Sequence, residues 1–233
     1  GDVYKRQMLK ELDRLEKENP EYFDVNSPTQ RVGGSVTKSF ITSVHGTPMY
    51  SLDNSYSLED LKEWEKRIKK IIETPLEYTC ELKFDGVSIN LTYKDGELVR
   101  AVTRGDGVKG DDVTNNVKTI PTVPLKLRGD FKGEFEARGE IVMPISGFNK
   151  LNLSRTENGE EPFKNPRNTA SGSLKLQDSK EVSKRPLECL LYSVEDSKMF
   201  NNHIEFLKNA KSYGFNIYNT CLLYTSDAAD ELR

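Results

Sequence analysis

The sequence predicts an α+β fold in which antiparallel sheets are flanked by helices, and the pattern of strands supports this prediction. Residues 77–93 alternate in hydropathy, and an Asp-Gly turn at 94–97 leads into a returning strand at 98–104. A further strand or pair of strands is expected at 131–143, and a buried strand at 187–194. Because hairpins are mixed with helices, the order of elements favours α+β over a regular βαβ alternation.

The clearest helix is predicted at residues 57–73. Ser57 can cap its first turn, Asp60 completes a capping-box-like pair, and Pro75 lies just past its end. Apolar side chains recur on one face at Leu58, Leu61, Trp64, Ile68 and Ile71 or Ile72. Further helices are expected at 8–18, 146–155, 170–176 and 202–213, the last stopped by Gly214.

The composition is that of a soluble globular protein of one or two domains. The 233 residues are 35% hydrophobic and 30% charged, and the net charge of −3 gives no overall basic signature, although a local basic groove is compatible with it. No apolar run approaches the roughly 20 residues that span a bilayer, and no secretory signal begins the chain. The three isolated cysteines disfavour a disulfide framework or a zinc site. We therefore expect a cytoplasmic protein.

The two ends of the chain resemble translated sequencing adapter. The codons GAT GTG TAT AAG AGA CAG, from the mosaic end of transposase-based libraries, encode the DVYKRQ near the start. The opposite adapter strand encodes CLLYTSDAAD near the end. We therefore interpret 1–7 and 221–233 as adapter-derived tails, 8–36 as the remnant of a helical subdomain with its linker, and 37–220 as an incomplete main domain.

The stretch CELKFDG, residues 80–86, places a lysine between two acids. In a strand, Cys80, Leu82 and Phe84 would point to the core. Glu81, Lys83 and Asp85 would lie side by side on the other face, and Gly86 would let the backbone turn or another group approach closely. One interpretation is a solvated strand face with a ladder of ions, and the other is a site in which Lys83 is a nucleophile.

A lysine amine attacks only when it is neutral, and the ordinary pKa of the side chain is about 10.4. Burial or nearby cations favour the neutral amine, whereas an adjacent carboxylate favours the charged form. A nucleophilic Lys83 therefore needs other positive charges or a metal ion in its site. We assign Asp85 to positioning the amine or to holding that metal.

The stretch ELKFDG fits the K-x-D-G signature of covalent nucleotidyltransferases, the superfamily of DNA ligases, RNA ligases and capping enzymes. Four other blocks follow the same order as in one of its families: PMYSLDNSYS (48–57), TRGDGVKGDDVTNNVKTIPTVPLKL (103–127), ARGEIVMP (137–144) and FKNPRNTASGSLK (163–175). Together they resemble the adenylation domain of bacterial NAD-dependent DNA ligase. The resemblance implies the covalent nucleotidyltransferase (ATP-grasp-like ligase) fold. An ATP-using ligase or a capping enzyme remains an alternative, although ATP-dependent ligases lack the flanking blocks.

The resemblance implies that Lys83 attacks the α-phosphate of NAD, that nicotinamide mononucleotide leaves, and that AMP stays on the lysine. AMP then passes to the 5′-phosphate of a nick in double-stranded DNA, and the 3′-hydroxyl displaces it. The expected cofactors are NAD and Mg²⁺, with zinc only in a downstream module. The protein is expected to act as a monomer in the bacterial cytoplasm, without membrane partners.

The resemblance also assigns residues to the nucleotide. Glu81 matches the acid that accepts from the exocyclic amine of adenine, and Ser51 and Leu52 match a pair that contacts the adenosine. Tyr192 matches a tyrosine near the nucleotide, with a core aromatic as the alternative role. These side chains are expected to bind NAD.

Charged side chains are assigned to the phosphates. Arg104 matches an arginine that engages the nucleotide, and Glu140 matches an acid that binds the ribose or supports a metal. Arg167 and Lys175 are expected to contact DNA phosphates, although the family typically carries arginine where Lys175 stands. They belong to a basic patch, which consists of Lys164, Arg167, Lys175, Lys180, Lys184 and Arg185. The alternative interpretation of this patch is an ordinary charged surface.

Two other patterns are assigned to structure. GDGVKG (105–110) satisfies G-x-G-x-x-G, but a Rossmann unit also needs a parallel βαβ context, so we expect its glycines to shape a loop at the rim of the site. His45 and His203 flank no acid or cysteine pattern and are expected to be structural.

The family's remaining modules are expected to lie outside this sequence. So are later motifs of the adenylation domain, which contribute two lysines that contact the phosphates. We therefore weigh two hypotheses for the chain: a self-adenylating domain, and a nucleotide- or DNA-binding fragment that cannot catalyse. They differ in whether Lys83 becomes covalently modified.

Overall fold

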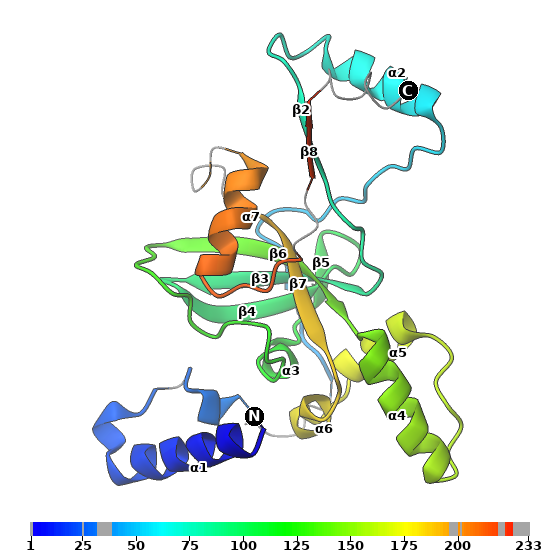
Figure 1. Ribbon diagram of the computed structural model, residues 1–233. Coiled ribbons are helices and arrows are strands. Elements are labelled where there is room, and N and C mark those ends of the chain that lie inside the picture. Colours follow the sequence, from blue (N-terminus) through cyan, green and yellow to red (C-terminus); the bar gives the residue numbers. More distant parts are fainter. Residues whose placement is uncertain are drawn as a thin grey trace.

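The computed structural model describes residues 2–24, 26–31, 39–195, 200, 202–218 and 222–225. Its centre is a four-stranded antiparallel sheet of order β4-β3-β6-β7 (Figure 1). Its strands are β3 (Val87–Lys94), β4 (Glu97–Thr103), β6 (Glu134–Val142) and β7 (Glu188–Val194). The predicted combination of antiparallel sheet and helices is therefore confirmed.

The remaining elements are short or lie around this sheet. The helices are α1 (Asp2–Glu18), α2 (Leu58–Ile68), α3 (Thr114–Val117), α4 (Ile145–Glu157), α5 (Pro166–Leu174), α6 (Ser179–Ser183) and α7 (His203–Ser212), with 3₁₀ turns at Pro20–Tyr22 and Pro28–Gln30. The strands β1 (Thr42–Val44) and β5 (Lys109–Asp111) form one small sheet, and β2 (Glu77–Cys80) and β8 (Leu222–Thr225) form another.

The hydrophobic core lies against one face of the central sheet, because only alternate residues of β3 belong to it. Ile89, Leu91 and Tyr93 are almost fully buried. The Tyr93 ring packs against Phe135 and Phe215, and its hydroxyl donates to the Pro124 carbonyl at 2.7 Å. Helix α7 contacts β7, whereas α3 contacts β4 and α6 (Figure 1). This packing holds the sheet as the rigid base of the molecule.

The β3–β4 hairpin forms where the sequence predicts it. Asp95 and Gly96 have φ values of 49° and 80°, and Lys94 pairs with Glu97 across the turn. Two successive residues with positive φ are typical of the type I′ turn, whose twist matches that of a hairpin.

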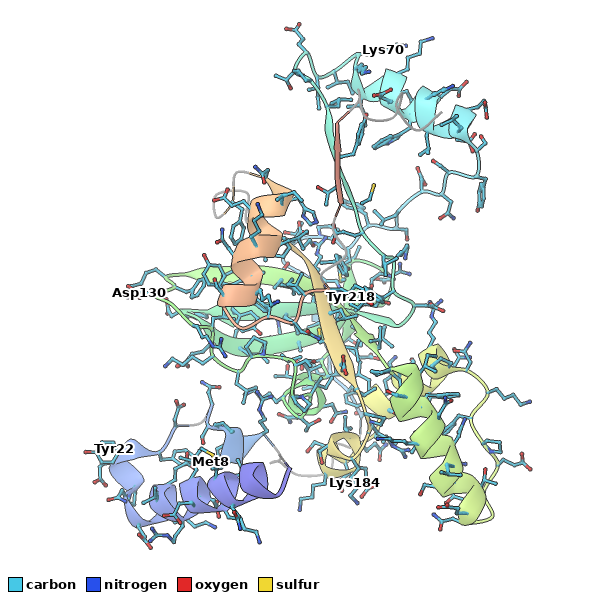
Figure 2. All side chains as sticks on the ribbon, viewed as in Figure 1. Met8, Tyr22, Lys70, Asp130, Lys184 and Tyr218 are labelled. Atoms are coloured by element: carbon cyan, nitrogen blue, oxygen red, sulfur yellow. The ribbon has the colours of Figure 1, made fainter. Side chains whose placement is uncertain are left out.

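The single strand predicted at 77–93 is wrong. The chain forms β2, leaves the extended ladder over residues 81–86, and enters the central sheet at Val87. Cys80 and Leu82 are therefore exposed rather than directed to the core, and Phe84 is half-buried against the ring of Tyr218, which is labelled in Figure 2. The hydropathy alternation continues through the break, so the sequence pattern does not indicate where β2 ends.

Helix α2 begins at the predicted cap but ends early. Ser57 and Asp60 form the expected capping box, yet the α-helix stops at Ile68, before a turn. None of its residues is buried; the helix stands away from the central sheet beside β2 and β8, where Trp64 contacts Tyr78 (Figure 1). The predicted apolar face therefore forms, but it is largely exposed in this chain.

The other predicted helices form with shifted ends. Helix α5 begins at Pro166 rather than at 170, because Asn165 caps it by accepting from the Asn168 N–H. The helix predicted at 8–18 extends back to Asp2, into the segment interpreted as a tail. Parts of 8–36 and of 221–233 lie outside the described residues. Within the described part of the chain, no helix combines the length and apolar composition needed to cross a bilayer.

Candidate active site

A cavity of about 870 Å³ lies where the 81–84 segment meets β3, β6 and β7. It brings together the residues that the sequence assigns to the nucleotide, which are Ser51, Leu52, Glu81, Lys83, Arg104, Glu140 and Tyr192. They come from separate parts of the chain. The cavity also takes in Phe84, Ser88 and Arg138. Asp85, Arg167 and Lys175 do not line it.

The break between β2 and β3 places Lys83 in this cavity. After the break, Gly86 passes so close to β6 that a Cβ on it would lie 2.3 Å from the Ile141 carbonyl oxygen. The Gly86 N–H donates to Glu140 Oε1 at 3.1 Å, and the Ser88 hydroxyl donates to Glu140 Oε2 at 2.7 Å. Glu140 therefore fixes the backbone just after Lys83.

The environment of Glu140 disfavours its charged form. Burial raises the pKa of the Glu140 carboxyl above its ordinary value of 4.5. The hydrogen bonds from Ser88 and Gly86 act in the opposite direction. The positive charges of Lys83 and Arg167 also lower this pKa, which places both cations within electrostatic reach of the carboxylate.

We expect Glu140→Gln to reduce the pH dependence of stability. Because the folded-state pKa of Glu140 is raised, its contribution to stability is fully present below the ordinary value of 4.5 and is lost as pH rises through the folded-state pKa. Glutamine does not titrate, so the variant should lose less stability than the wild type over that interval. Urea unfolding at a series of pH values measures this, and parallel curves for the two proteins would contradict the prediction.

The loop that carries Ser51 and Leu52 is held by two charged side chains of β6 that the sequence analysis missed. The Glu136 carboxylate accepts from the Gly46 and Thr47 N–H groups at 2.9 and 3.1 Å. Arg138 donates to the Thr47 and Pro48 carbonyls at 3.0 and 3.1 Å. Glu136, Arg138 and Glu140 alternate in EFEARGE, and a period of two places all of them on one face of the strand. From that alternation, the sequence analysis could have predicted that Glu136 and Arg138 share a strand face with Glu140.

Arg104 reaches the same loop. Its Nη1 lies 3.3 Å from the Ser51 hydroxyl, and the guanidinium is exposed to the cavity. Beneath it, buried His45 contacts the Arg104 carbonyl through Nε2 at 3.1 Å and the Asn90 amide through Nδ1 at 3.3 Å. His45 therefore has the structural role that we predicted.

The GDGVKG stretch forms a tight turn between β4 and β5. Gly105 and Gly107 have φ values of 57° and 96°, and Asp106 accepts from the Val108 and Lys109 N–H groups, both at 2.9 Å. The Gly107 carbonyl accepts from the N–H of Met49, beside Ser51. The turn thus shapes the rim of the cavity, and the antiparallel sheet excludes the Rossmann alternative.

Asp85 and Arg167 form an ion pair outside the cavity. Arg167 Nη1 lies 2.9 Å from Asp85 Oδ1, and both side chains are exposed. Arg167 is the second residue of α5, so the Asn165 cap also sets its position. The predicted ladder of Glu81, Lys83 and Asp85 on one strand face is therefore wrong: no strand forms there, and the two acids contact different partners.

Glu81 contacts a residue distant in sequence. Glu81 Oε1 lies 2.5 Å from Nε2 of His203, the first residue of α7. We predicted only a structural role for His203, because sequence spacing gives no indication of this contact.

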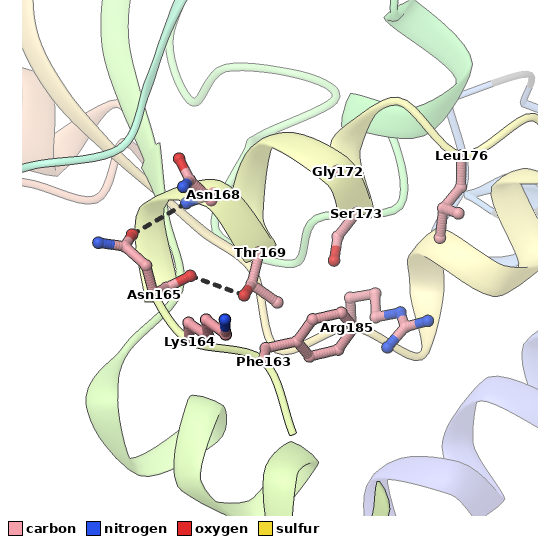
Figure 3. Close-up of a pocket in the computed structure, with 9 residues that line it drawn as sticks. All are labelled: Phe163, Lys164, Asn165, Asn168, Thr169, Gly172, Ser173, Leu176 and Arg185. Atoms are coloured by element: carbon pink, nitrogen blue, oxygen red, sulfur yellow. Dashed lines mark hydrogen bonds between the residues drawn. The ribbon is translucent and has the colours of Figure 1, made fainter. Parts of the chain in front are cut away.

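A second cavity, of about 340 Å³, lies along α5 (Figure 3). Lys164 and Arg185 of the basic patch line it together with Asn165, Asn168 and Ser173. Lys175, which the sequence analysis assigned to DNA phosphates, does not line this cavity. Its Nζ pairs with Asp111 Oδ2 at 2.7 Å. Among the described residues, no three His, Cys, Asp or Glu side chains are grouped as a metal site.

The architecture is thus that of a mixed α/β domain with a cavity at its antiparallel sheet, lined by both charged and apolar side chains. Residues 37–232 match the family model of the NAD-dependent DNA ligase adenylation domain, and residues 2–33 match that of the DNA ligase-like, N-terminal NAD⁺-binding domain. The chain therefore belongs to the NAD-dependent DNA ligase adenylation-domain family, as its resemblance indicated.

Curated relatives agree with this assignment. The chain is 62% identical over 211 residues to a DNA ligase of Flavobacterium psychrophilum, and 61% identical over 210 residues to one of Christiangramia forsetii. It is 49% identical over 212 residues to a DNA ligase of Bacteroides fragilis. Each alignment covers 90% of this chain but 32% of the relative, so the chain spans about a third of the length of these proteins.

Proposed function

We propose that the chain binds NAD in the 870 Å³ cavity and that Lys83 takes the adenylyl group. The observation that carries this proposal is the convergence on one cavity of Lys83 with the predicted nucleotide contacts. The fold we propose is accordingly that of the covalent nucleotidyltransferases. Family membership and the antiparallel sheet support this finer assignment.

In the proposed reaction, the neutral amine of Lys83 attacks the α-phosphorus of NAD. A P–N bond forms, the bond to the phosphate oxygen of nicotinamide mononucleotide breaks with its electron pair, and the amine gives up a proton. The developing negative charge lies on the phosphate oxygens, where Arg104 supplies an opposing charge. Lys83 and Arg104 thus have the roles of nucleophile and electrostatic stabiliser.

The adenosine is assigned to the other cavity residues. Glu81 accepts from the exocyclic amine of the base, and Tyr192 offers a partly exposed ring beside it. Ser51 and Leu52 contact the nucleoside from the loop held by Glu136 and Arg138. The base is thereby oriented before the phosphate reacts.

Mg²⁺ is compatible with the carboxylates present. Mg²⁺ commonly uses one or two carboxylates together with substrate phosphates, so it does not require a group of three protein ligands. Glu140 in the cavity would be one protein ligand, and Asp85, two residues after Lys83, would have to leave its ion pair with Arg167 to be a second. When bound, the ion would neutralise phosphate charge and favour the neutral amine of Lys83.

For the longer protein we propose sealing of nicks in double-stranded DNA, as a cytoplasmic monomer. The names of the relatives and the exposed basic patch at residues 164–185 support DNA as the second substrate. Arg167 and Lys175 are the proposed phosphate contacts of this patch, together with Lys164 and Arg185 at the α5 cavity.

We expect Lys164→Ala and Arg185→Ala each to weaken binding to nicked duplex DNA similarly for all sequences. If each removes one phosphate contact, the slope of log affinity against log salt should fall by about 1 per variant. Fluorescence anisotropy over a salt series measures this. The control is Lys150→Ala on exposed α4, outside the basic patch. Unchanged slopes in both patch variants would refute the phosphate assignment.

We keep our division of the chain as a proposal: tails at 1–7 and 221–233, a helical remnant at 8–36, and the adenylation domain at 37–220. Adapter-like codons at both ends support it. Resequencing the locus from intact genomic DNA decides it, because an uninterrupted reading frame through both tails would contradict the adapter origin.

Intact-protein mass spectrometry tests the proposed reaction. The chain is incubated with Mg²⁺ and, side by side, with NAD, ATP or GTP. An increment of one AMP residue with NAD alone supports the self-adenylating domain. Binding of NAD without an increment supports the alternative, a nucleotide-binding fragment that cannot catalyse. An increment with ATP or GTP instead would overturn the assignment of NAD.

A further inference from the structure

The contact between Glu81 and His203 joins a segment that lies outside the strands to the core. Glu81 lies in the 81–86 segment, outside the strands, and lines the main cavity. His203 begins α7, whose Phe206 and Leu207 are buried in the hydrophobic core. Because the helix is anchored and the segment is not in a ladder, the histidine can fix where the carboxylate lies.

His203 itself is held in place by its surroundings. Asn202 caps α7 by accepting from the Glu205 N–H at 2.9 Å, which sets the backbone at His203. The imidazole ring packs against Phe206 with a centroid separation of 5.5 Å. Its Nε2 therefore meets Glu81 Oε1 from a defined direction, at 2.5 Å.

This contact gives the two carboxylate oxygens of Glu81 different hydrogen-bond partners. With a proton on Nε2, His203 donates to Oε1 and leaves Oε2 to accept from a ligand. A purine with an exocyclic amine can donate to that oxygen. A purine with a carbonyl at the same position presents a second acceptor, which leaves both groups unpaired in the site.

We propose that His203 is a positioning residue that sets the preference of the cavity for an amino-purine over an oxo-purine. It acts through Glu81 and does not touch the ligand. This inference rests on the proposed function, because it takes the nucleotide to lie in the cavity with its base against Glu81.

Binding of AMP and IMP to the full 233-residue chain tests the inference. These nucleotides differ at position 6 of the base and in the hydrogen that IMP carries on N1, and isothermal titration gives the ratio of their affinities without any need for catalysis. We expect the wild type to prefer AMP and His203→Ala to lower the AMP-to-IMP ratio by about tenfold, mainly through weaker AMP binding. His203→Gln retains an N–H donor and should recover part of the preference.

The controls separate positioning from folding. Lys208→Ala lies on the exposed side of the same helix and should leave the ratio unchanged. Circular dichroism of each variant checks that α7 is intact. If the wild type prefers AMP and His203→Ala leaves the ratio unchanged, the role proposed for His203 is overturned and the proposed base site stands. A wild type that binds neither nucleotide, or both equally, overturns the proposed base site and this inference with it.

Discussion

Replacing Lys83 by alanine is expected to abolish covalent adenylate formation, because no other lysine lines the main cavity among the residues that the structure describes. Lys83→Arg should be equally inactive. Arginine keeps a positive charge in the site, but its guanidinium stays protonated and is a poor nucleophile. We expect both variants to lower the rate of adenylation by at least about 10³-fold, the scale on which loss of a nucleophile acts.

The experiment is most sensitive in a complete enzyme. Residues 37–220 can replace the matching part of the Flavobacterium psychrophilum DNA ligase, which is 62% identical over the aligned region. Adenylation by NAD is followed by intact mass, and nick sealing by gel assay. Lys132→Ala, an exposed lysine paired with Asp130, is the matched control. An adenylate that survives in Lys83→Ala would mean that another residue is the nucleophile.

Replacing Gly86 by alanine is expected to destabilise the fold and to displace Lys83. The added Cβ would lie 2.3 Å from the Ile141 carbonyl oxygen and 2.9 Å from Val142 Cγ1. Ile141 is in the central sheet and is fully buried, so the strand cannot easily yield. The segment around Gly86 must then move, and its N–H loses the bond to Glu140.

We expect this substitution to cost about 2–4 kcal/mol, as overpacking together with a lost hydrogen bond to a carboxylate. Urea unfolding of the chain measures the cost, and the ligase chimera measures the accompanying loss of adenylation. Gly172→Ala is the matched control, because a Cβ there meets nothing within 4 Å and the residue lies inside helix α5. A Gly86→Ala variant as stable as this control would contradict the close approach to β6.

The comparison of Gly86 with the rest of its motif shows why the strand prediction failed. Side chains alternate between polar and apolar from β2 through Asp85, so the pattern indicates one long strand. After the break, Gly86 runs against β6 at a separation that only glycine permits. A close approach between segments more than fifty residues apart has no local signal.

Local patterns were sufficient elsewhere. The Asp-Gly hairpin turn and the Ser57 cap formed where they were predicted, because each depends on residues within one turn of the chain. The identities of the cavity residues also followed from motif blocks, since those residues keep a fixed order along the sequence. By contrast, the apolar face of α2 was predicted correctly as a pattern but lies largely exposed, because burial depends on which other elements are present.

The sequence by itself determined the antiparallel α+β class, the family and the residues assigned to the nucleotide. Only the tertiary structure decided that Asp85 pairs with Arg167 and that Glu81 contacts His203. It also decided that Glu136 and Arg138 hold the Ser51 loop. The reason is physical: turns and caps are set by neighbours along the chain, whereas these contacts form only when packing of the central sheet brings distant segments together.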